Sequence, residues 1–89
     1  MYRIEVSPSA ERELHKLKVR IRKEDFELIT SAIKSLRYEP RPQGVRKIKS
    51  KEELYRIRAG RYRVIYEIMD SNQLVVLLVI SRRSENTYR

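Results

Sequence analysis

The residues with the clearest chemical potential are arginines that alternate with apolar and aromatic residues in the segment 54–66. Side chains alternate along a β-strand, so Arg56 and Arg58 point to the face opposite their apolar neighbours. A two-residue type II′ turn beginning at Gly60 would place Arg63 on the next strand, directly opposite Arg58. The segment therefore predicts a β-hairpin with three guanidinium groups on one face of a sheet.

These arginines are suited to binding phosphate. Guanidinium groups bind phosphate oxygens through paired N–H donors, and their fixed charge also suits the extra negative charge of a phosphoryl transition state. Eight basic and two acidic residues lie in the segment 45–63, so positive charge is concentrated at this hairpin. The alternative is a solvated sheet face on which the arginines are neutralised by nearby carboxylates, those of Glu52, Glu53 and Glu67.

Residues on either side of the hairpin extend the candidate site. Arg82 follows an apolar strand and can reach the same cleft, and Tyr88 can stack on a base or supply a phenol. Tyr88 could equally be an ordinary cap over the sheet edge. Further phosphate contacts are expected from basic residues in the neighbouring loop, the turn and the tail: Lys47, Lys49, Lys51, Arg61 and Arg83.

Length and composition limit the classes of function. The 89 residues suffice for one domain, which we expect to span residues 1–89. A net charge of +9 indicates a polyanionic partner, with nucleic acid ahead of an anionic membrane surface. The chain has no cysteine and one histidine, which argues against disulfides, metal sites, thiol nucleophiles and a Ser-His-Asp triad. We expect no metal or cofactor, no membrane span or secretion signal, and a cytoplasmic location.

Two amphipathic helices are predicted in the first half of the chain. Ser7 followed by Pro8 is typical of a helix start, with serine as the N-cap. Apolar residues then recur at intervals of three and four, in the first helix at Ala10, Leu14, Leu17 and Ile21, and in the second at Phe26, Ile29, Ile33 and Leu36. Two such helices form a hairpin whose apolar stripes need a sheet to cover.

Four strands are predicted from alternating or apolar segments, namely residues 2–7, 55–59, 62–69 and 73–80. The last three indicate an antiparallel meander. The unbroken apolar run 74–80 favours a central strand that is covered on both faces, at least in part. The predicted fold class is α+β, with a small, mixed and mostly antiparallel sheet of four strands and the N-terminal helical hairpin packed on one face.

Over essentially its whole length the chain resembles the RelE/ParE superfamily of bacterial and archaeal toxins, and more closely its RelE branch. Besides the order of the elements, three segments carry the resemblance: Tyr55-Arg56-Ile57-Arg58, Tyr62-Arg63-Val64-Ile65-Tyr66 and the tail from Arg82 to Tyr88. The resemblance implies a fold like that of microbial ribonucleases. It also implies a metal-independent endoribonuclease that cleaves messenger RNA in the ribosomal A site, through attack of the 2′-hydroxyl, and so inhibits translation.

The resemblance further implies partners and residue roles. The partners are the ribosome, messenger RNA and a cognate acidic, RelB-like antitoxin that wraps around the toxin in a hetero-oligomer. Arg63 matches the family arginine that grips the scissile phosphate, Arg82 matches the arginine at the exit of the last strand, and Tyr88 matches the tyrosine that stacks on the substrate. Arg56 and Arg58 stand where the best-studied RelE enzymes carry two lysines. Because arginine stays protonated, these two are expected to stabilise and position charge, and the general base is left open.

Two other functions are compatible with the sequence. A ParE-like toxin of the same fold would inhibit DNA gyrase by binding, without RNA chemistry, although the arginine-rich hairpin and Tyr88 argue against this. A nonenzymatic RNA-binding module would need only the basic charge balance. The leading hypothesis is the ribosome-dependent nuclease. Because the chain has few side chains suited to general acid–base catalysis, we expect the enzyme to depend on the ribosome to arrange its substrate, and naked RNA to be cleaved poorly.

Overall fold

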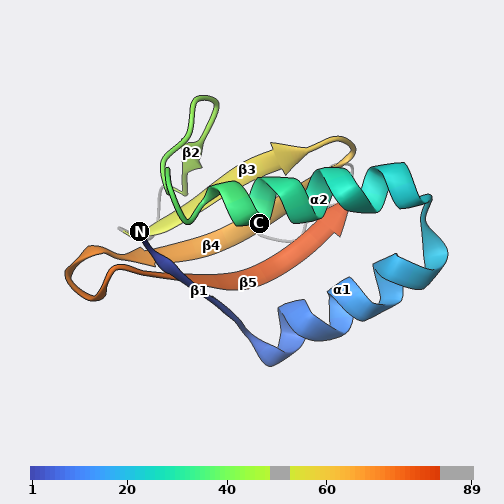
Figure 1. Ribbon diagram of the computed structural model, residues 1–89, viewed down its shortest axis with the longest axis horizontal. Coiled ribbons are helices and arrows are strands. Elements are labelled where there is room, and N and C mark those ends of the chain that lie inside the picture. The colour runs from blue at the N-terminus through green and yellow to red at the C-terminus, as the bar shows by residue number, and fades with distance from the viewer. Residues whose placement is uncertain (49–52, 83–89) are drawn as a thin grey trace.

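The computed structural model describes residues 1–48 and 53–82 of the chain. Two helices cover one face of a mixed sheet (Figure 1), namely α1 (Pro8–Arg20) and α2 (Lys23–Ser35). The sheet has the order β1-β5-β4-β3-β2 and consists of β1 (Arg3–Val6), β2 (Arg46–Lys47), β3 (Leu54–Ala59), β4 (Tyr62–Met69) and β5 (Leu74–Arg82). β1 runs parallel to β5, and the other neighbours are antiparallel. The predicted α+β class is confirmed.

The strand count differs from the prediction, because the described sheet has five strands instead of four. The additional strand is β2, in which Arg46 lies opposite Arg56 and Lys47 lies opposite Tyr55 on β3. Its two residues are both basic and exposed, so the segment carries no apolar alternation. Only pairing to β3 makes it a strand, which is a long-range effect that local sequence does not encode.

The first helix begins where the sequence predicts. The Ser7 hydroxyl accepts a hydrogen bond from the Ala10 backbone N–H at 3.1 Å, and Pro8 occupies the first turn, where its missing N–H costs nothing. Ser7 also anchors the helix to the sheet, because its backbone N–H donates to the Leu77 carbonyl at 3.0 Å. α1 therefore leaves β1 at a fixed point beside β5.

The core lies between the two helices and the sheet. The helices contribute Ala10, Leu17, Ile29, Ile33 and Leu36, and the strands contribute alternate residues that include Tyr55, Ile57, Tyr62, Val64, Tyr66, Ile68, Val75, Leu77 and Ile80. Burial of this apolar surface, at roughly 25 cal/mol per Å², is the main stabilising term. The three tyrosines lie on the core face, as the alternation predicted. No helix in the described residues is long and apolar enough to cross a membrane.

The turn between β3 and β4 has the predicted geometry. Gly60 has φ +62° while Arg61 does not have a positive φ, the pattern of a type II′ turn with glycine in first position. The pairs Ala59–Tyr62 and Arg58–Arg63 follow in register. The register that brings Arg58 and Arg63 together is therefore set by a two-residue turn.

β5 lies between β1 and β4, which confirms its prediction as a central strand. Its pairing to β4 shifts between Ile65 and Tyr66, which lie opposite Val79 and Leu77 respectively, so Leu78 is an extra residue in the strand. A bulge of this kind changes the phase of side-chain alternation. Hence Leu77 faces the core before the bulge and Ile80 faces it afterwards.

A polar network fixes the end of the sheet that lies opposite Gly60. Arg41 donates two hydrogen bonds to the Asp70 carboxylate, at 3.2 and 2.8 Å, and its Nε donates to the Tyr55 hydroxyl at 3.2 Å. The Tyr2 hydroxyl donates to the same carboxylate at 2.6 Å. Together these bonds tie the loop after α2 to β3, to the β4–β5 turn and to the start of β1. These bonds therefore hold Arg41 in place at the start of the loop that leads into β2.

Candidate nucleic-acid interface

The arginines of the β3–β4 hairpin share one face of the sheet. Arg58 pairs with Arg63, and Arg56 lies between Arg46 on β2 and Ile65 on β4. Residues directly opposite on neighbouring strands project to the same face. The intervening residues of β3 and β4 belong to the core, so these four arginines project away from both helices. We call Arg46, Arg56, Arg58 and Arg63 the arginine face.

Like charges are crowded on the arginine face. The pKa of Arg56 lies below its ordinary value, first because the residue is partly buried and then because of the positive charges of Arg63, Arg58 and Arg46. Arg58 is exposed, whereas Arg56 and Arg63 are half-buried. Repulsion among groups that cannot lose their protons disfavours the face by itself, and a bound anion relieves it. A phosphate group among these side chains would therefore lower the repulsion.

Apolar residues lie between these charges. Ile65 is only 4% exposed although it projects away from the helices, and its neighbours across the strands are Arg56 and Val79. The next row joins Arg63 to Ser81. Arginine stems cover apolar surface while their guanidinium groups stay in water. The arginine face therefore has a buried apolar side chain, that of Ile65, among its charged groups.

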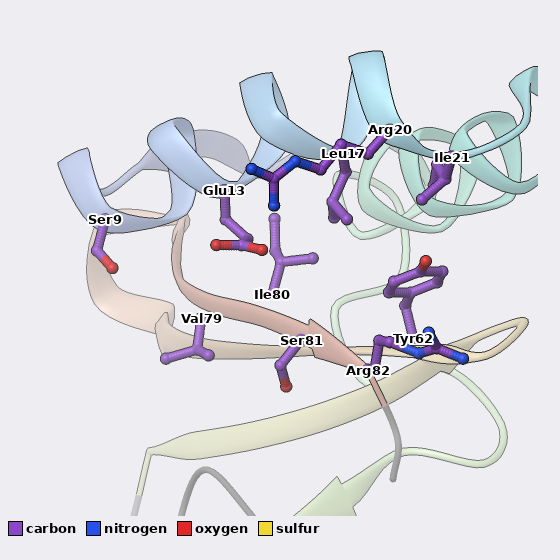
Figure 2. Close-up of a pocket in the computed structure, with 10 residues that line it drawn as sticks. All are labelled: Ser9, Glu13, Leu17, Arg20, Ile21, Tyr62, Val79, Ile80, Ser81 and Arg82. Carbon is purple, nitrogen blue, oxygen red and sulfur yellow. The ribbon is translucent and has the colours of Figure 1, made fainter. Parts of the chain in front are cut away.

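Arg82 is not placed on the arginine face, contrary to the predicted convergence. It pairs with Tyr62, which faces the core, so its side chain leaves β5 on the side of α1, beside the Tyr62 ring (Figure 2). The sequence alone could not settle this, because the run 74–80 does not alternate and the bulge at Leu78 resets its phase. Arg82 is exposed at the end of β5, one residue after Ser81, which lies opposite Arg63.

A pocket of about 510 Å³ lies between α1 and the end of β5. Figure 2 shows Leu17 and Ile80 pointing toward one another across it, with the Arg20 guanidinium lying above Ile80. The lining residues come from α1 and its C-terminal end and from the ends of β4 and β5: Ser9, Glu13, Leu17, Arg20, Ile21, Tyr62, Val79, Ile80, Ser81 and Arg82. This helix-side pocket is where the structure places Arg82.

A second pocket, of about 410 Å³, borders the arginine face on the side of the sheet formed by β2 and β3. It lies between α2, the loop 42–44 and the edge of β3, and we call it the edge pocket. Its lining residues are Ala32, Ser35, Pro42, Gln43, Gly44, Arg46, Ile57 and Arg58. Arg58 therefore belongs both to the arginine face and to this pocket.

The remaining predicted contacts have different positions. Arg61 is exposed in the β3–β4 turn. Lys47 pairs with Tyr55, a core-facing residue, and so projects to the helix side, away from the arginine face. The other predicted site residues, Lys49, Lys51, Arg83 and Tyr88, lie outside the described residues. In residues 1–48 and 53–82, no group of three metal-ligating side chains is close enough to hold a metal ion.

Sequence reasoning did not single out Arg46 as a site residue. Arg46 joins the arginine face because β2 pairs with β3 at that position, and the only signal in the sequence was its place in a basic segment. Gln43 and Ser35 were not considered either. They lie far from the hairpin in sequence and meet Arg58 only at the edge pocket.

Comparison with known proteins gives the family. Residues 4–87 match the family described as the ParE toxin of the type II toxin–antitoxin system parDE. The chain belongs to this toxin family. A curated relative, the putative toxin RelE1 of Methanocaldococcus jannaschii, is 32% identical over 60 residues, which cover 64% of this chain and 66% of the relative. The match thus spans just under two thirds of that relative's length.

Solved structures of RelE toxins share the fold. A chain of the archaeal RelE–RelB complex from Pyrococcus horikoshii OT3 superposes with a TM-score of 0.78 at 26% identity, over 94% of this chain and 97% of that chain. The isolated RelE toxin of E. coli also gives 0.78, at 17% identity, over 98% and 89% of the two chains. The predicted resemblance to the RelE/ParE superfamily is confirmed, and the chain is a RelE-like toxin of a toxin–antitoxin system.

Proposed function

We propose that this toxin is a ribosome-dependent endoribonuclease that cleaves messenger RNA in the ribosomal A site and so inhibits translation. The observation that carries the proposal is the directly opposed pair Arg58 and Arg63, next to Arg56, on a sheet face that points away from both helices. Such crowding of fixed positive charge has a physical rationale if a phosphate lies among the guanidinium groups. The similarity to RelE toxins supports the same ligand class.

In the proposed reaction, the 2′-hydroxyl oxygen attacks the adjacent phosphorus and the bond from phosphorus to the 5′-oxygen breaks. The products are a 2′,3′-cyclic phosphate and a free 5′-hydroxyl, so one proton leaves the nucleophile and one reaches the leaving oxygen. Arg58 and Arg63 would bind the non-bridging oxygens as negative charge develops. Arg56 would position the backbone or assist the leaving group, and Tyr88 would align or deprotonate the 2′-hydroxyl.

Arg82 would act from the end of β5. It is exposed there, next to the residue that pairs with Arg63, so a nucleic acid strand that crosses the strand end would pass within its reach. The arginines supply charge and position but cannot accept a proton. A catalyst of this kind depends on its substrate being held in line, and the ribosome would supply that geometry. Naked RNA should therefore be a poor substrate.

The partner that restrains the toxin is proposed to be a cognate acidic antitoxin of the RelB type. The similar chain from Pyrococcus horikoshii was solved in a RelE–RelB complex. A net charge of +9 on this chain gives an acidic protein a strong electrostatic attraction. Co-expression with a small acidic protein encoded by a neighbouring reading frame should yield a hetero-oligomer and restore growth.

The direct test is primer extension on translating ribosomes with the wild-type protein and with Arg63→Ala. We expect the substitution to lower the single-turnover cleavage rate by about 100-fold or more, as for the loss of one charge-stabilising donor. Arg12→Ala is the matched control, because Arg12 is an exposed residue of α1 that belongs neither to the arginine face nor to either pocket. Equal cleavage by the wild type and Arg63→Ala would reject the proposal.

One observation favours a second candidate function. The matching family is described by its ParE member, and a ParE-like toxin would inhibit DNA gyrase by binding. A gyrase supercoiling assay run beside the ribosome assay separates the two functions. Inhibition of supercoiling without RNA cleavage would favour the ParE-like function, and we expect the opposite result.

A further inference from the structure

The edge pocket opens where β2 stops covering β3. Within the described residues, β2 pairs with β3 at Tyr55 and Arg56 and not at Ile57 or beyond. Ile57 on β3 and Ala32 on α2 supply apolar surface to the resulting space. Its volume of about 410 Å³ falls within the range of about 300–1,000 Å³ that is usual for small-molecule sites.

The loop side of the pocket is shaped by Gly44. This residue has φ +91°, a conformation that favours glycine, and a Cβ built on it would meet no atom within 4 Å. The loop thus leaves open space beside the neighbouring Gln43.

Two polar side chains that line the pocket can form hydrogen bonds with a ligand. The Gln43 amide enters no hydrogen bond with another group of residues 1–48 and 53–82, so its donor and acceptor are both available. The Ser35 hydroxyl donates to the Ala32 carbonyl at 2.8 Å, and its lone pairs can still accept. An amide with one carbonyl and one NH₂ group matches the edge of adenine, which offers an acceptor at N7 and a donor at N6.

Two cations border the same pocket. In the described part of the chain, no hydrogen bond or ion pair uses the guanidinium groups of Arg46 and Arg58. Arg46 lies opposite Arg56, and Arg58 is two residues further along β3, so both side chains line the pocket from the same face of the sheet. Arg58 also forms the opposed pair with Arg63, so one side chain connects the pocket to the arginine face.

We propose that the edge pocket is a nucleotide subsite that binds the base next to the scissile linkage and prefers adenine. The base would lie between the apolar surfaces of Ala32 and Ile57, Gln43 would bind its edge, and Arg46 and Arg58 would hold its phosphate. This inference rests on the proposed nuclease function, because it assigns the sequence preference of that cleavage to Gln43. It also makes Arg46 a phosphate-binding residue.

The test uses ribosomes programmed with messenger RNAs whose A-site codon is randomised, with cleavage ends counted by sequencing. The wild type should favour adenine at one position next to the cut by about 5-fold or more, as for one bidentate amide–base pair. Gln43→Ala should abolish that preference by lowering cleavage at the adenine-containing codons to the level of the other codons, because the amide contact to the base is lost. Ala32→Leu should fill the pocket and lower cleavage at the favoured codons by about 10-fold.

Ser31→Leu is the matched control for Ala32→Leu. Ser31 is the preceding residue of the same helix, is exposed and does not line the pocket, so its cleavage profile should equal that of the wild type. Thermal unfolding of all variants checks that the fold is retained. If Ala32→Leu is unstable, Gln43→Ala decides the outcome by itself, since Gln43 is exposed in a loop.

The possible outcomes separate the subsite from the proposed function. If Arg63→Ala abolishes cleavage while Gln43→Ala and Ala32→Leu keep both the rate and the base profile, the subsite is wrong and the nuclease stands. If the wild type does not cleave on ribosomes, the nuclease is wrong. The subsite is then decided by the affinities of fluorescein-labelled oligoadenylate and oligouridylate, and equal binding of the two by the wild type, or no loss of discrimination in Gln43→Ala, overturns it.

Discussion

Arg58 combines two roles that oppose each other. It lies directly opposite Arg63 and close to Arg56, so its charge disfavours the folded state while preparing the face for an anion. Pairs of like charge across a sheet are destabilising by up to about 1 kcal/mol, and salt screens the repulsion between exposed charges. At this position stability and the proposed function therefore conflict.

Arg58→Gln should make the protein more stable and less active. We expect the free energy of unfolding to rise by about 0.2–1 kcal/mol at low ionic strength. The gain should shrink in about 1 M salt, where the Debye length is about 3 Å. Urea unfolding at two salt concentrations measures this, and Arg12→Gln is the control without an opposed arginine. A gain that did not depend on salt would show that repulsion is not its cause.

The protonation of Asp70 depends on folding, because its hydrogen-bond partners are brought together only in the folded protein. Hydrogen bonds from Arg41 and then Tyr2 lower the pKa of Asp70 to about 2, from 3.8. A group with a depressed pKa in the folded state stabilises that state above its unfolded pKa, and the stabilisation is lost as the pH falls through the folded pKa. The contribution of Asp70 is thus complete above about pH 4 and is lost toward pH 2.

Asp70→Asn should lower the unfolding temperature at neutral pH, because the asparagine cannot form the charge-assisted pair with Arg41. The difference from the wild type should stay constant from neutral pH to about pH 4 and shrink between pH 4 and 2. Thermal unfolding followed by circular dichroism across this range tests the direction. Glu67→Gln is a useful control, since no ion pair among the described residues includes Glu67. A difference that grew on acidification would contradict the assignment.

At the scale of elements, the β3–β4 hairpin determines whether the arginines meet. Its two-residue turn depends on Gly60, whose φ of +62° is unfavourable for a residue with a side chain. A Cβ at this position would also lie 3.2 Å from Leu28 Cδ1, but this atom is the end of a flexible, half-exposed side chain. The backbone conformation is therefore the larger obstacle to substitution.

Gly60→Ala should destabilise the protein by about 1–3 kcal/mol, the usual cost of a residue held in a sparsely populated backbone region. A shift of the turn that relieves the strain would move Arg58 out of register with Arg63, so cleavage should fall as well. Chemical denaturation together with the ribosome assay gives both values. Semi-synthetic D-alanine at this position should restore stability, because it accepts positive φ, and its failure to do so would contradict backbone strain as the cause of the loss.

At the scale of the whole molecule, charge determines how the toxin meets its partners. The chain carries 21 basic and 12 acidic residues, and the arginine face gathers four of the basic ones. Binding to single-stranded nucleic acid releases counterions, so affinity falls with salt by a slope of about 0.7 for each phosphate that is neutralised. Long-range attraction and local phosphate contacts thus both contribute to the salt dependence of the binding affinity.

The salt dependence of RNA binding should reveal individual contacts. The slope of log K against log salt for a short oligoribonucleotide should become less steep by about 0.7 in Arg46→Ala or Arg58→Ala, because each removes one phosphate contact. Arg12→Ala should lower affinity slightly and leave the slope unchanged. Fluorescence anisotropy over a salt series provides the measurement. Equal slopes for all variants would mean that these arginines do not touch phosphate.

Much of the fold followed from local patterns. The Ser7-Pro8 helix start, the apolar spacing of both helices and the alternation of β3 and β4 each depend on neighbours within a few residues, so they could be predicted. The Gly60 turn fixed the arginine parity in the same way. These features require only the periodicity of helices and strands and the tolerance of glycine for positive φ.

Other features depended on contacts between distant segments. β2 exists because it pairs with β3, the phase of β5 is set by a bulge against β4, and the edge pocket combines α2, a loop and a strand. The sequence alone therefore determined that arginines gather on one face of a hairpin. Only the tertiary structure decided that Arg46 joins that face and that Arg82 leaves it, because strand register and long-range packing are properties of the whole sheet and have no local signature.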